Sequence, residues 1–230
     1  MLPLRDDQPR YSNPWVTWFL IALNLLIFFF EFTLPPRSLD ALIRQFGVVP
    51  SHTAAFLAGS PRYPLPVVVL PFFTSMFLHG SWLHVLGNMW FLYIFGDNVE
   101  DYLGHFKYLV FYILTGLIAM VTQVMINLHS NLPTVGASGA IAGVLGAYFV
   151  VYPRARVLTW FFIFVLWVPA WVILGYWFAL NFLSGTASTL AMQGDIGGVA
   201  FWAHVGGFIS GALLVKVFGE RQLRYPYALR

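Results

Sequence analysis

Charged residues are scarce in this sequence. Asp, Glu, Lys and Arg make up 9% of its 230 residues, and hydrophobic residues make up 59%. A soluble domain usually has about a quarter of its residues charged, so the composition predicts one compact membrane domain. Cysteine is absent, which excludes disulfides and thiolate metal sites. Because Lys and Arg form no dense cluster, we expect no nucleic-acid partner despite the net charge of +3.

Six hydrophobic stretches approach the length of about 20 residues that a membrane helix needs. They predict an all-α membrane protein whose six-helix bundle covers residues 15–218, between a tail at 1–14 and a tail at 219–230. The proline-rich connection at 35–78 should be a long, partly ordered loop lying against the membrane. The polar opening residues and the long first stretch predict no cleavable signal peptide. The expected spans are 15–34, 82–100, 108–128, 138–152, 157–183 and 199–218.

Lys and Arg are unevenly divided between the loops. With the N-terminus in the cytoplasm, nine fall inside and only Arg37, Arg44 and Arg62 fall outside. Basic residues favour the cytoplasmic side, so we expect both termini in the cytoplasm. The lack of organelle targeting features favours a bacterial cytoplasmic membrane. In this orientation the second, fourth and sixth spans all begin near the outer face.

Ser138 stands at the start of the fourth span, shortly after Gly136. Fifteen residues of helix cover about 22 Å, less than a hydrocarbon core of about 30 Å. The helix could therefore begin below the surface, in a recessed pocket where free backbone N–H groups stabilise an oxyanion. Taken alone, a serine in a membrane helix is more often a packing residue, and that alternative stays open here.

His204 lies near the start of the sixth span, at the level expected for Ser138. Gly207 and Gly211 share the helix face of His204, and small residues recur every fourth residue from Gly139 in the fourth span. Small residues at such spacing let membrane helices approach closely. A hydrogen bond between a nucleophile and its base requires that approach. Each glycine stripe alone is compatible with ordinary packing, but the serine and histidine at matching ends favour a catalytic pair. The glycines are Gly139, Gly143, Gly207 and Gly211.

His84 and Asn88 are four residues apart and share one face of the second span. Acyl transfer needs donors for the developing oxyanion, and an imidazole N–H and an amide NH₂ can supply them. The alternative is interhelical hydrogen bonding that only fixes this span. His79, one turn nearer the loop, is expected to be structural. A His–His–Asn cluster without a carboxylate suits zinc poorly, so we expect neither a metal nor another cofactor.

Together these motifs resemble the rhomboid intramembrane proteases: Gly-x-Ser-Gly at 136–139, His-x-x-x-Asn at 84–88 and Ala-His-x-x-Gly-x-x-x-Gly at 203–211, with His79 and Glu100 also fitting. The resemblance implies a rhomboid-like six-helix bundle and a Ser138–His204 dyad without an acidic third member. It implies an oxyanion site made by His84, Asn88 and the Ser138 backbone N–H. It also implies a serine endopeptidase that cleaves membrane-anchored proteins near the outer face of a lipid bilayer; the oligomeric state stays open.

Two positions depart from the family pattern. Many bacterial rhomboids have a Trp-Arg pair in the first loop, where this chain reads Val-Leu-Pro-Phe at 69–72. They often carry a tyrosine four residues after the nucleophile that stacks on the catalytic histidine, and here that residue is Ala142. His204 should then be held by Trp202 or by aromatic residues of neighbouring spans. The fifth span is a candidate lateral gate, although aromatic residues are also typical of lipid-facing helices; its aromatic residues include Phe161, Phe162, Phe164, Trp167 and Trp171.

Three other functions fit parts of the sequence. A non-enzymatic rhomboid-like protein that binds membrane clients should have lost Ser138 or His204, and both are present. A membrane cytochrome with His84 and His204 as haem ligands leaves the glycine-flanked serine unexplained. A secondary transporter should show a repeated half, and we find none.

Overall fold

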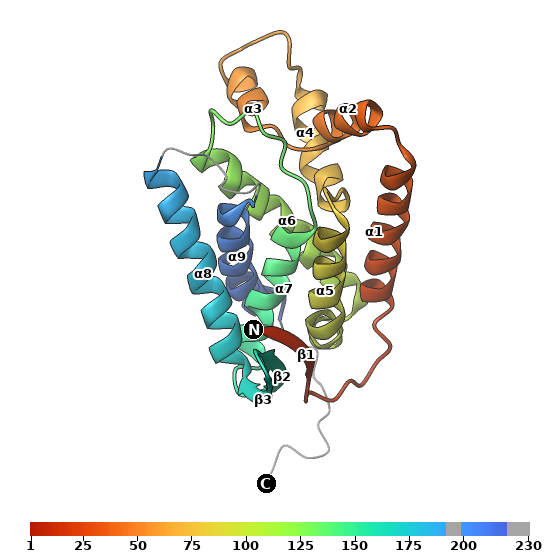
Figure 1. Cartoon of the computed structure of the whole chain (residues 1–230), viewed down its shortest axis with the longest axis vertical. Helices are drawn as coiled ribbons and strands as arrows, with labels where there is room; N and C mark the ends of the chain where they lie inside the picture. Colours follow the sequence, from red (N-terminus) through yellow and green to blue (C-terminus); the bar gives the residue numbers. More distant parts are fainter. Residues whose placement is uncertain (192–198, 220–230) are drawn as a thin grey trace.

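The computed structural model describes residues 1–191 and 199–219, and within these ranges the chain is mostly helical (Figure 1). The helices form a bundle with a small sheet at one end and three short helices at the other. The bundle helices are α1 (Trp15–Thr33), α5 (Trp82–Leu103), α6 (His105–Ile126), α7 (Ser138–Val151), α8 (Ala170–Leu190) and α9 (Phe201–Phe218). The remaining elements are α2 (Pro36–Phe46), α3 (Pro50–Leu57), α4 (Leu65–Thr74), the 3₁₀ turn η1 (Ser75–Phe77), β1 (Leu2–Asp6), β2 (Arg156–Phe161) and β3 (Phe164–Pro169).

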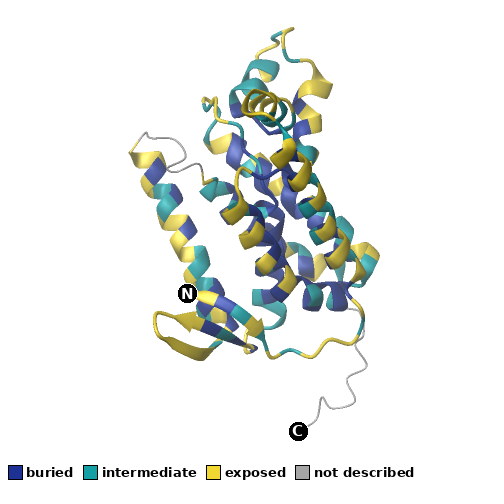
Figure 2. Ribbon diagram, turned by 45° about the vertical axis from the view of Figure 1, so that its right-hand side comes forward, coloured by how far each residue is buried: buried dark blue, intermediate teal, exposed yellow. Residues whose placement is uncertain are grey.

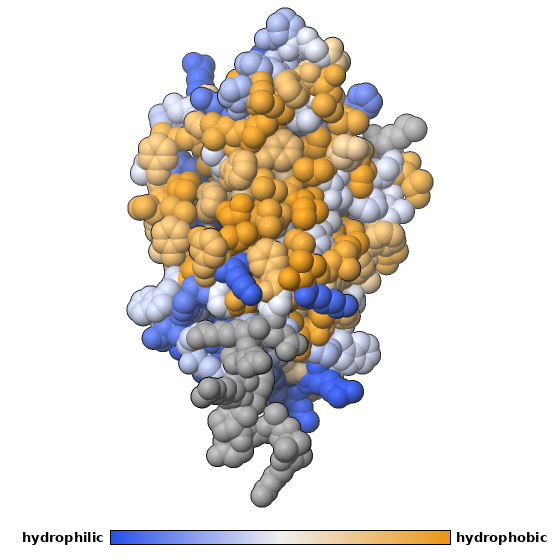
Figure 3. All heavy atoms as spheres, turned by 180° about the vertical axis from the view of Figure 1, so that it is seen from behind, coloured by the Kyte–Doolittle hydropathy of each residue, from blue (hydrophilic) through white to orange (hydrophobic). Residues whose placement is uncertain are grey.

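Several of these helices are membrane spans by length and composition. Among the described residues, α1, α6, α8 and α9 are long and apolar enough to cross a membrane, and α4–η1 with α5 forms a fifth candidate bent by 76°. Apolar side chains cover the middle of the molecular face in Figure 3, and hydrophilic ones gather toward its ends. The chain is therefore an integral membrane protein. By length and apolar composition, the described residues contain four or five membrane spans rather than the six expected. Helix α7, with 14 residues, is too short to be counted as one.

Helix α7 lies in the middle of the bundle, in contact with α5, α6, α8 and α9. Ten of its 14 residues are buried, and Figure 2 shows buried residues gathered along the centre while the outer helix faces are exposed. The α7–α9 contact is made by glycine: a Cβ at Gly207 would overlap the carbonyl oxygen of Gly139, and one at Gly211 would overlap that of Gly143. The two backbones can approach this closely only without side chains at these positions, which brings the first turns of both helices together.

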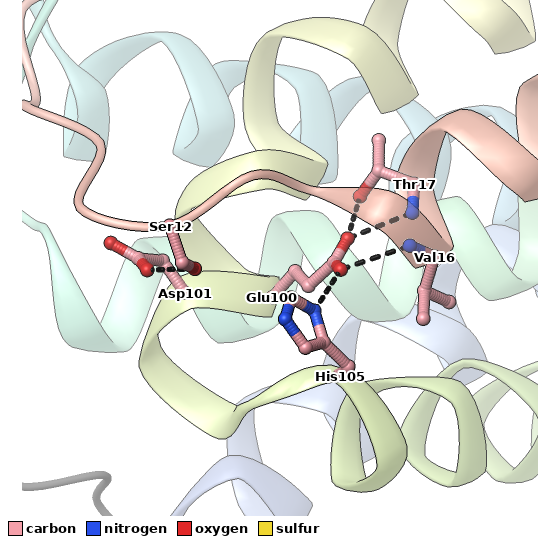
Figure 4. Close-up of polar contacts among 6 residues, drawn as sticks. All are labelled: Ser12, Val16, Thr17, Glu100, Asp101 and His105. Carbon is pink, nitrogen blue, oxygen red and sulfur yellow. Dashed lines mark hydrogen bonds and ion pairs between the residues drawn. The ribbon is translucent and has the colours of Figure 1, made fainter.

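Helix α1 is fixed at its start by a carboxylate from the end of α5 (Figure 4). The buried side chain of Glu100 accepts hydrogen bonds from the backbone N–H groups of Val16 and Thr17 at 2.9 and 2.8 Å. It also accepts one from the Thr17 hydroxyl at 2.7 Å and contacts His105 Nδ1 at 2.6 Å. An anion at a helix N-terminus satisfies otherwise unpaired N–H groups and the helix dipole, so Glu100 sets where α1 begins.

The segment between α1 and α5 is better ordered than the loop expected from its prolines, because it contains α2, α3, α4 and η1. It is bonded through its backbone to the stretch before α7. Val48 and Thr134 exchange two backbone hydrogen bonds of 3.0 and 2.7 Å, and the N–H of Gly136 donates to the carbonyl of Ser75 at 2.8 Å. These bonds hold the chain just before Ser138.

The expected fifth span at 157–183 is wrong. Residues 156–169 form the antiparallel hairpin β2–β3, whose turn contains Phe162 at φ 53°, and α8 then continues to Leu190 through part of the expected loop at 184–198. Strand β1, inside the expected tail, pairs antiparallel with β2. Alternating burial reveals the strand, since Val157 and Thr159 are fully buried and Trp160 is exposed. Runs rich in β-branched and aromatic residues are typical of strands, which hydropathy alone does not separate from helix. Most of the expected C-terminal tail, 220–230, lies outside the described residues.

Candidate active site

The central pair of the site joins the first turns of α7 and α9. Ser138 is the first residue of α7, and its Oγ lies 2.8 Å from Nε2 of His204 in α9. The glycine contact between the two helices positions both backbones. The two residues singled out by the sequence motifs are therefore within hydrogen-bonding distance, although they are 66 positions apart.

Both residues line a cavity of about 620 Å³ between helices. Most of its wall is apolar, as in sites that bind an apolar ligand and orient it with a few polar groups. Trp177 reaches the cavity from α8, and Phe91 reaches it from α5. The full lining is Gly80, Ser81, Leu83, His84, Gly87, Asn88, Phe91, Val135, Ser138, Ile141, Leu145, Trp177, Val199, Ala200 and His204.

His84 and Asn88 face the backbone that leads into Ser138. Gly136 has φ 126°, and a Cβ there would lie 2.7 Å from Cε1 and Nε2 of His84 and 3.7 Å from Nδ2 of Asn88. Only glycine accommodates both that conformation and that contact. The imidazole and the amide are thus beside the start of α7, where the first N–H groups have no acceptor within the helix.

Helix α8 supplies two contacts to His204: an aromatic ring, which fits the expectation of an aromatic residue from a neighbouring span, and an Asn side chain that the sequence motifs did not predict. Asn181 Oδ1 lies 2.6 Å from His204 Nδ1, and the Trp177 ring lies 5.5 Å from the imidazole between centroids. Trp202 does not take this place, because its indole N–H donates to the Thr189 hydroxyl. The available signal was an Asn inside an apolar span, which warrants a functional hypothesis, with an aromatic residue four positions earlier on the same face.

The expected gate residues are placed differently from the prediction. Phe161, Phe162, Phe164 and Trp167 belong to the β2–β3 hairpin, at the opposite end of the bundle from α2–α4 (Figure 1). Trp171 lies in the first turn of α8, next to that hairpin. Of the aromatic residues of the expected fifth span, Trp177 is the one that lines the cavity.

The Rhomboid domain family model matches residues 68–221, two thirds of the chain. The chain belongs to the rhomboid family. Curated relatives of this rhomboid include Rhomboid-like protein 11, chloroplastic, of Arabidopsis thaliana, 31% identical over 155 residues that cover 65% of this chain and 52% of that protein. Rhomboid protein 1, mitochondrial, of Saccharomyces cerevisiae is 30% identical over 144 residues, 60% of this chain and 39% of that protein.

A third relative is the Presenilin-associated rhomboid-like protein A, mitochondrial, of Danio rerio. It is 29% identical over 151 residues, which cover 62% of this chain and 36% of that protein. The chain thus spans about a third to a half of the length of the first curated relatives it matches. The three relatives named here are described as chloroplastic or mitochondrial proteins, so they give no support to the expected bacterial membrane.

In this rhomboid, His79 connects the cavity to α1. Its Nε2 lies 3.0 Å from Nδ2 of Asn88, and because an amide nitrogen only donates, His79 is the acceptor. The backbone N–H of His79 contacts the buried carboxylate of Glu31 in α1 at 3.2 Å. The His79 ring therefore orients the Asn88 amide. Among residues 1–191 and 199–219, no group of three or more His, Cys, Asp or Glu side chains is arranged to hold a metal ion.

Proposed function

We propose that this rhomboid is a serine endopeptidase that cleaves transmembrane or membrane-anchored proteins. The observation that carries the proposal is the 2.8 Å contact between Ser138 Oγ and His204 Nε2 on the wall of a cavity that also holds His84 and Asn88. A serine beside a base, with donors for an oxyanion, is the arrangement that acyl transfer requires. No metal or cofactor takes part in the mechanism.

The reaction proceeds by general base and nucleophilic catalysis. His204 Nε2 accepts the Ser138 proton as Oγ attacks the peptide carbonyl, and the protonated imidazole then gives that proton to the leaving amine. Water next attacks the acyl-enzyme, again with His204 as base. Hydrolysis restores both residues to their starting protonation states.

The carbonyl oxygen becomes negatively charged in each tetrahedral intermediate. The Ser138 N–H at the start of α7, the Asn88 amide and the His84 imidazole are the donors that would bind it. Each such donor is worth about 2.7–4 kcal/mol of barrier. The hydrogen bond from the Asn88 amide to His79 Nε2 fixes the orientation of that amide, which reduces the reorganisation needed during the reaction.

The substrate enters between α5 and α8, whose side chains form two walls of the cavity. A helical segment hides its scissile bond, so the substrate must be extended near Ser138. The Lys and Arg distribution favours both termini in the cytoplasm, and we propose α7 as a sixth, short span at the centre of the bundle. Cleavage then takes place near the outer face, where α7 begins.

Fluorophosphonate labelling tests the proposal. The detergent-solubilised protein should label, and Ser138→Ala and His204→Ala should abolish labelling. Ser210→Ala is the matched control, because this buried serine of α9 donates only to the Gly207 carbonyl among the bonds described for it and its variant should label normally. If the folded parent neither labels nor cleaves a panel of transmembrane substrates, the proposal is wrong, and a client-binding protein without protease activity is favoured.

A further inference from the structure

A Ser–His dyad mechanism leaves one polar side chain of the site without a role. Asn181 of α8 is 9% exposed, and its Oδ1 lies 2.6 Å from the imidazole nitrogen opposite Ser138. Its Nδ2 donates to the Trp177 carbonyl at 2.8 Å. The amide is therefore held at both ends, by its own helix and by His204.

These two bonds determine the tautomer of His204. A carbonyl only accepts, so the Trp177 carbonyl requires the Asn181 NH₂ and turns Oδ1 toward the imidazole. Oδ1 also only accepts, so Nδ1 of His204 carries the proton. Nε2 then has a free lone pair, directed at the Ser138 hydroxyl at 2.8 Å. A neutral imidazole in this tautomer is ready to accept the serine proton.

We propose that Asn181 is a positioning residue that holds His204 as the base for Ser138, and that it makes catalysis depend on where α8 lies. This inference rests on the proposed protease function. The position four residues after the nucleophile is Ala142, whose methyl group cannot hold the imidazole. Trp177 and Asn181 hold it from α8 instead.

Helix α8 is much less buried than the central helix α7, so it can be displaced without opening the core of the bundle. Six of its 21 residues are buried, against ten of 14 in α7. Near the site it contacts α9 through the rings of Phe178 and Phe208, 4.9 Å apart, and of Phe182 and Trp202, 5.9 Å apart. A substrate that displaces this half of α8 lengthens the bond to His204. The base is then oriented only after α8 returns, so opening and chemistry alternate.

Steady-state kinetics on the full chain in proteoliposomes test the positioning role. Asn181→Leu should lower kcat about 10- to 100-fold with little change in KM, as expected for loss of base orientation. Asn181→Asp should recover most of kcat and move the acidic limb of its pH profile up by about one unit, because a carboxylate stabilises the imidazolium. His84, the other titratable side chain lining the cavity, is unchanged in both variants.

The control is Thr186→Val on the same helix, which removes a hydroxyl bonded to the Phe182 carbonyl and should leave kcat and the pH profile unchanged. Asn181→Leu within twofold of the parent, or Asn181→Asp as impaired as Asn181→Leu with no shift of the limb, overturns the inference while Ser138-dependent cleavage upholds the protease function. If the parent cleaves nothing, the proposed function fails and this inference fails with it.

Cross-linking tests the dependence on α8. The chain has no cysteine, so Phe178→Cys with Phe208→Cys introduces a single pair that a short, reducible bifunctional thiol reagent can join across the α8–α9 contact. After cross-linking, a small fluorophosphonate should label Ser138 within about twofold of the rate before cross-linking, because the base stays held. Cleavage of a transmembrane substrate should fall more than tenfold and return on reduction. Unchanged cleavage in the cross-linked protein overturns the coupling.

A separate observation concerns the β2–β3 hairpin. Eight consecutive residues, from Trp160 to Trp167, are all hydrophobic, and each is 40% exposed or more. A hairpin in water commonly has one polar face, and the exposed stretch at 160–167 has no polar side chain except the indole N–H groups of its tryptophans. Its turn residue Phe162 adopts φ 53°, a conformation that favours Gly or Asn, yet it carries an aromatic ring.

We infer that this hairpin inserts its tip into the lipid leaflet at that end of the bundle. The two tryptophans stand at the base of the exposed stretch, as in interfacial anchors. Exposed Arg5, Arg154 and Arg156 lie beside it, and the Arg5 guanidinium lies 5.6 Å from the Trp167 ring. In this arrangement the apolar tip would lie among the lipid acyl chains, and the arginines at the start of the hairpin would lie beside the lipid phosphates. The hairpin leads directly into α8, so it also fixes the N-terminal end of that helix.

A probe at the tip tests this inference. Ile163→Cys, labelled with an environment-sensitive fluorophore in proteoliposomes, should show blue-shifted emission that lipids with a quencher in the acyl chain reduce. Pro9→Cys, on the exposed segment after β1, is the control and should respond to aqueous iodide instead. If the Ile163→Cys probe responds to iodide as strongly as the control does, the hairpin lies in water and the inference is wrong.

Discussion

Replacing Glu100 by Ala should destabilise the protein without disabling the site. The carboxylate is fully buried and accepts three hydrogen bonds from Val16 and Thr17. The Thr17 hydroxyl can rotate to another acceptor, but the two backbone donors cannot. A buried donor left unpaired costs about 1–3 kcal/mol, and the favourable charge at the helix start adds up to about 1 kcal/mol. We therefore expect a loss of roughly 2–7 kcal/mol in unfolding free energy.

For a chain of this size each kcal/mol shifts Tm by about 2–4 °C, so Glu100→Ala should melt roughly 4–28 °C lower in detergent. Well below that temperature, Ser138 labelling should stay within about threefold of the parent, since Glu100 lies near the end of α5 away from the site. The control is Asp40→Ala, which breaks an exposed ion pair with Arg44 and should cost less than about 1 kcal/mol. Equal melting temperatures for the two variants would refute the reasoning.

Further predictions concern the helix contact, the oxyanion site and pH. Gly211→Ala, which would overlap the Gly143 carbonyl, should cost at least about 1–3 kcal/mol in thermal unfolding, whereas Gly175→Ala meets open packing and should cost little. Asn88→Ala should lower kcat about 10²- to 10³-fold in a cleavage assay, with the fold retained. Burial raises the pKa of Asp6 from 3.8 to about 6, so the folded state binds an extra proton between these values. Stability should fall by up to roughly 3 kcal/mol as pH rises through this window, and Asp6→Asn should weaken that dependence in melting curves.

Much of the bundle could be predicted because its signals are local. Hydropathy alone locates α1, α6 and α9 to within a few residues, and the shared depth of three helix starts brings Ser138 and His204 together. The contact with Asn181 could not be derived this way, since it depends on the rotation of α8 about its axis. Hydropathy also predicts the start of that helix too early, because it does not distinguish the apolar strands β2 and β3 from a helix.

The pair of backbone hydrogen bonds between Val48 and Thr134 has a consequence for engineering. The bonds that hold Thr134 and Gly136 come from main-chain atoms of Val48 and Ser75, and such bonds tolerate changes of side chain. The sequence at 69–72 can therefore differ from the Trp-Arg pattern without moving the nucleophile. A first loop transplanted from another rhomboid should therefore keep activity with residues 130–136 left unchanged, provided that its backbone bonds Thr134 and Gly136 as Val48 and Ser75 do.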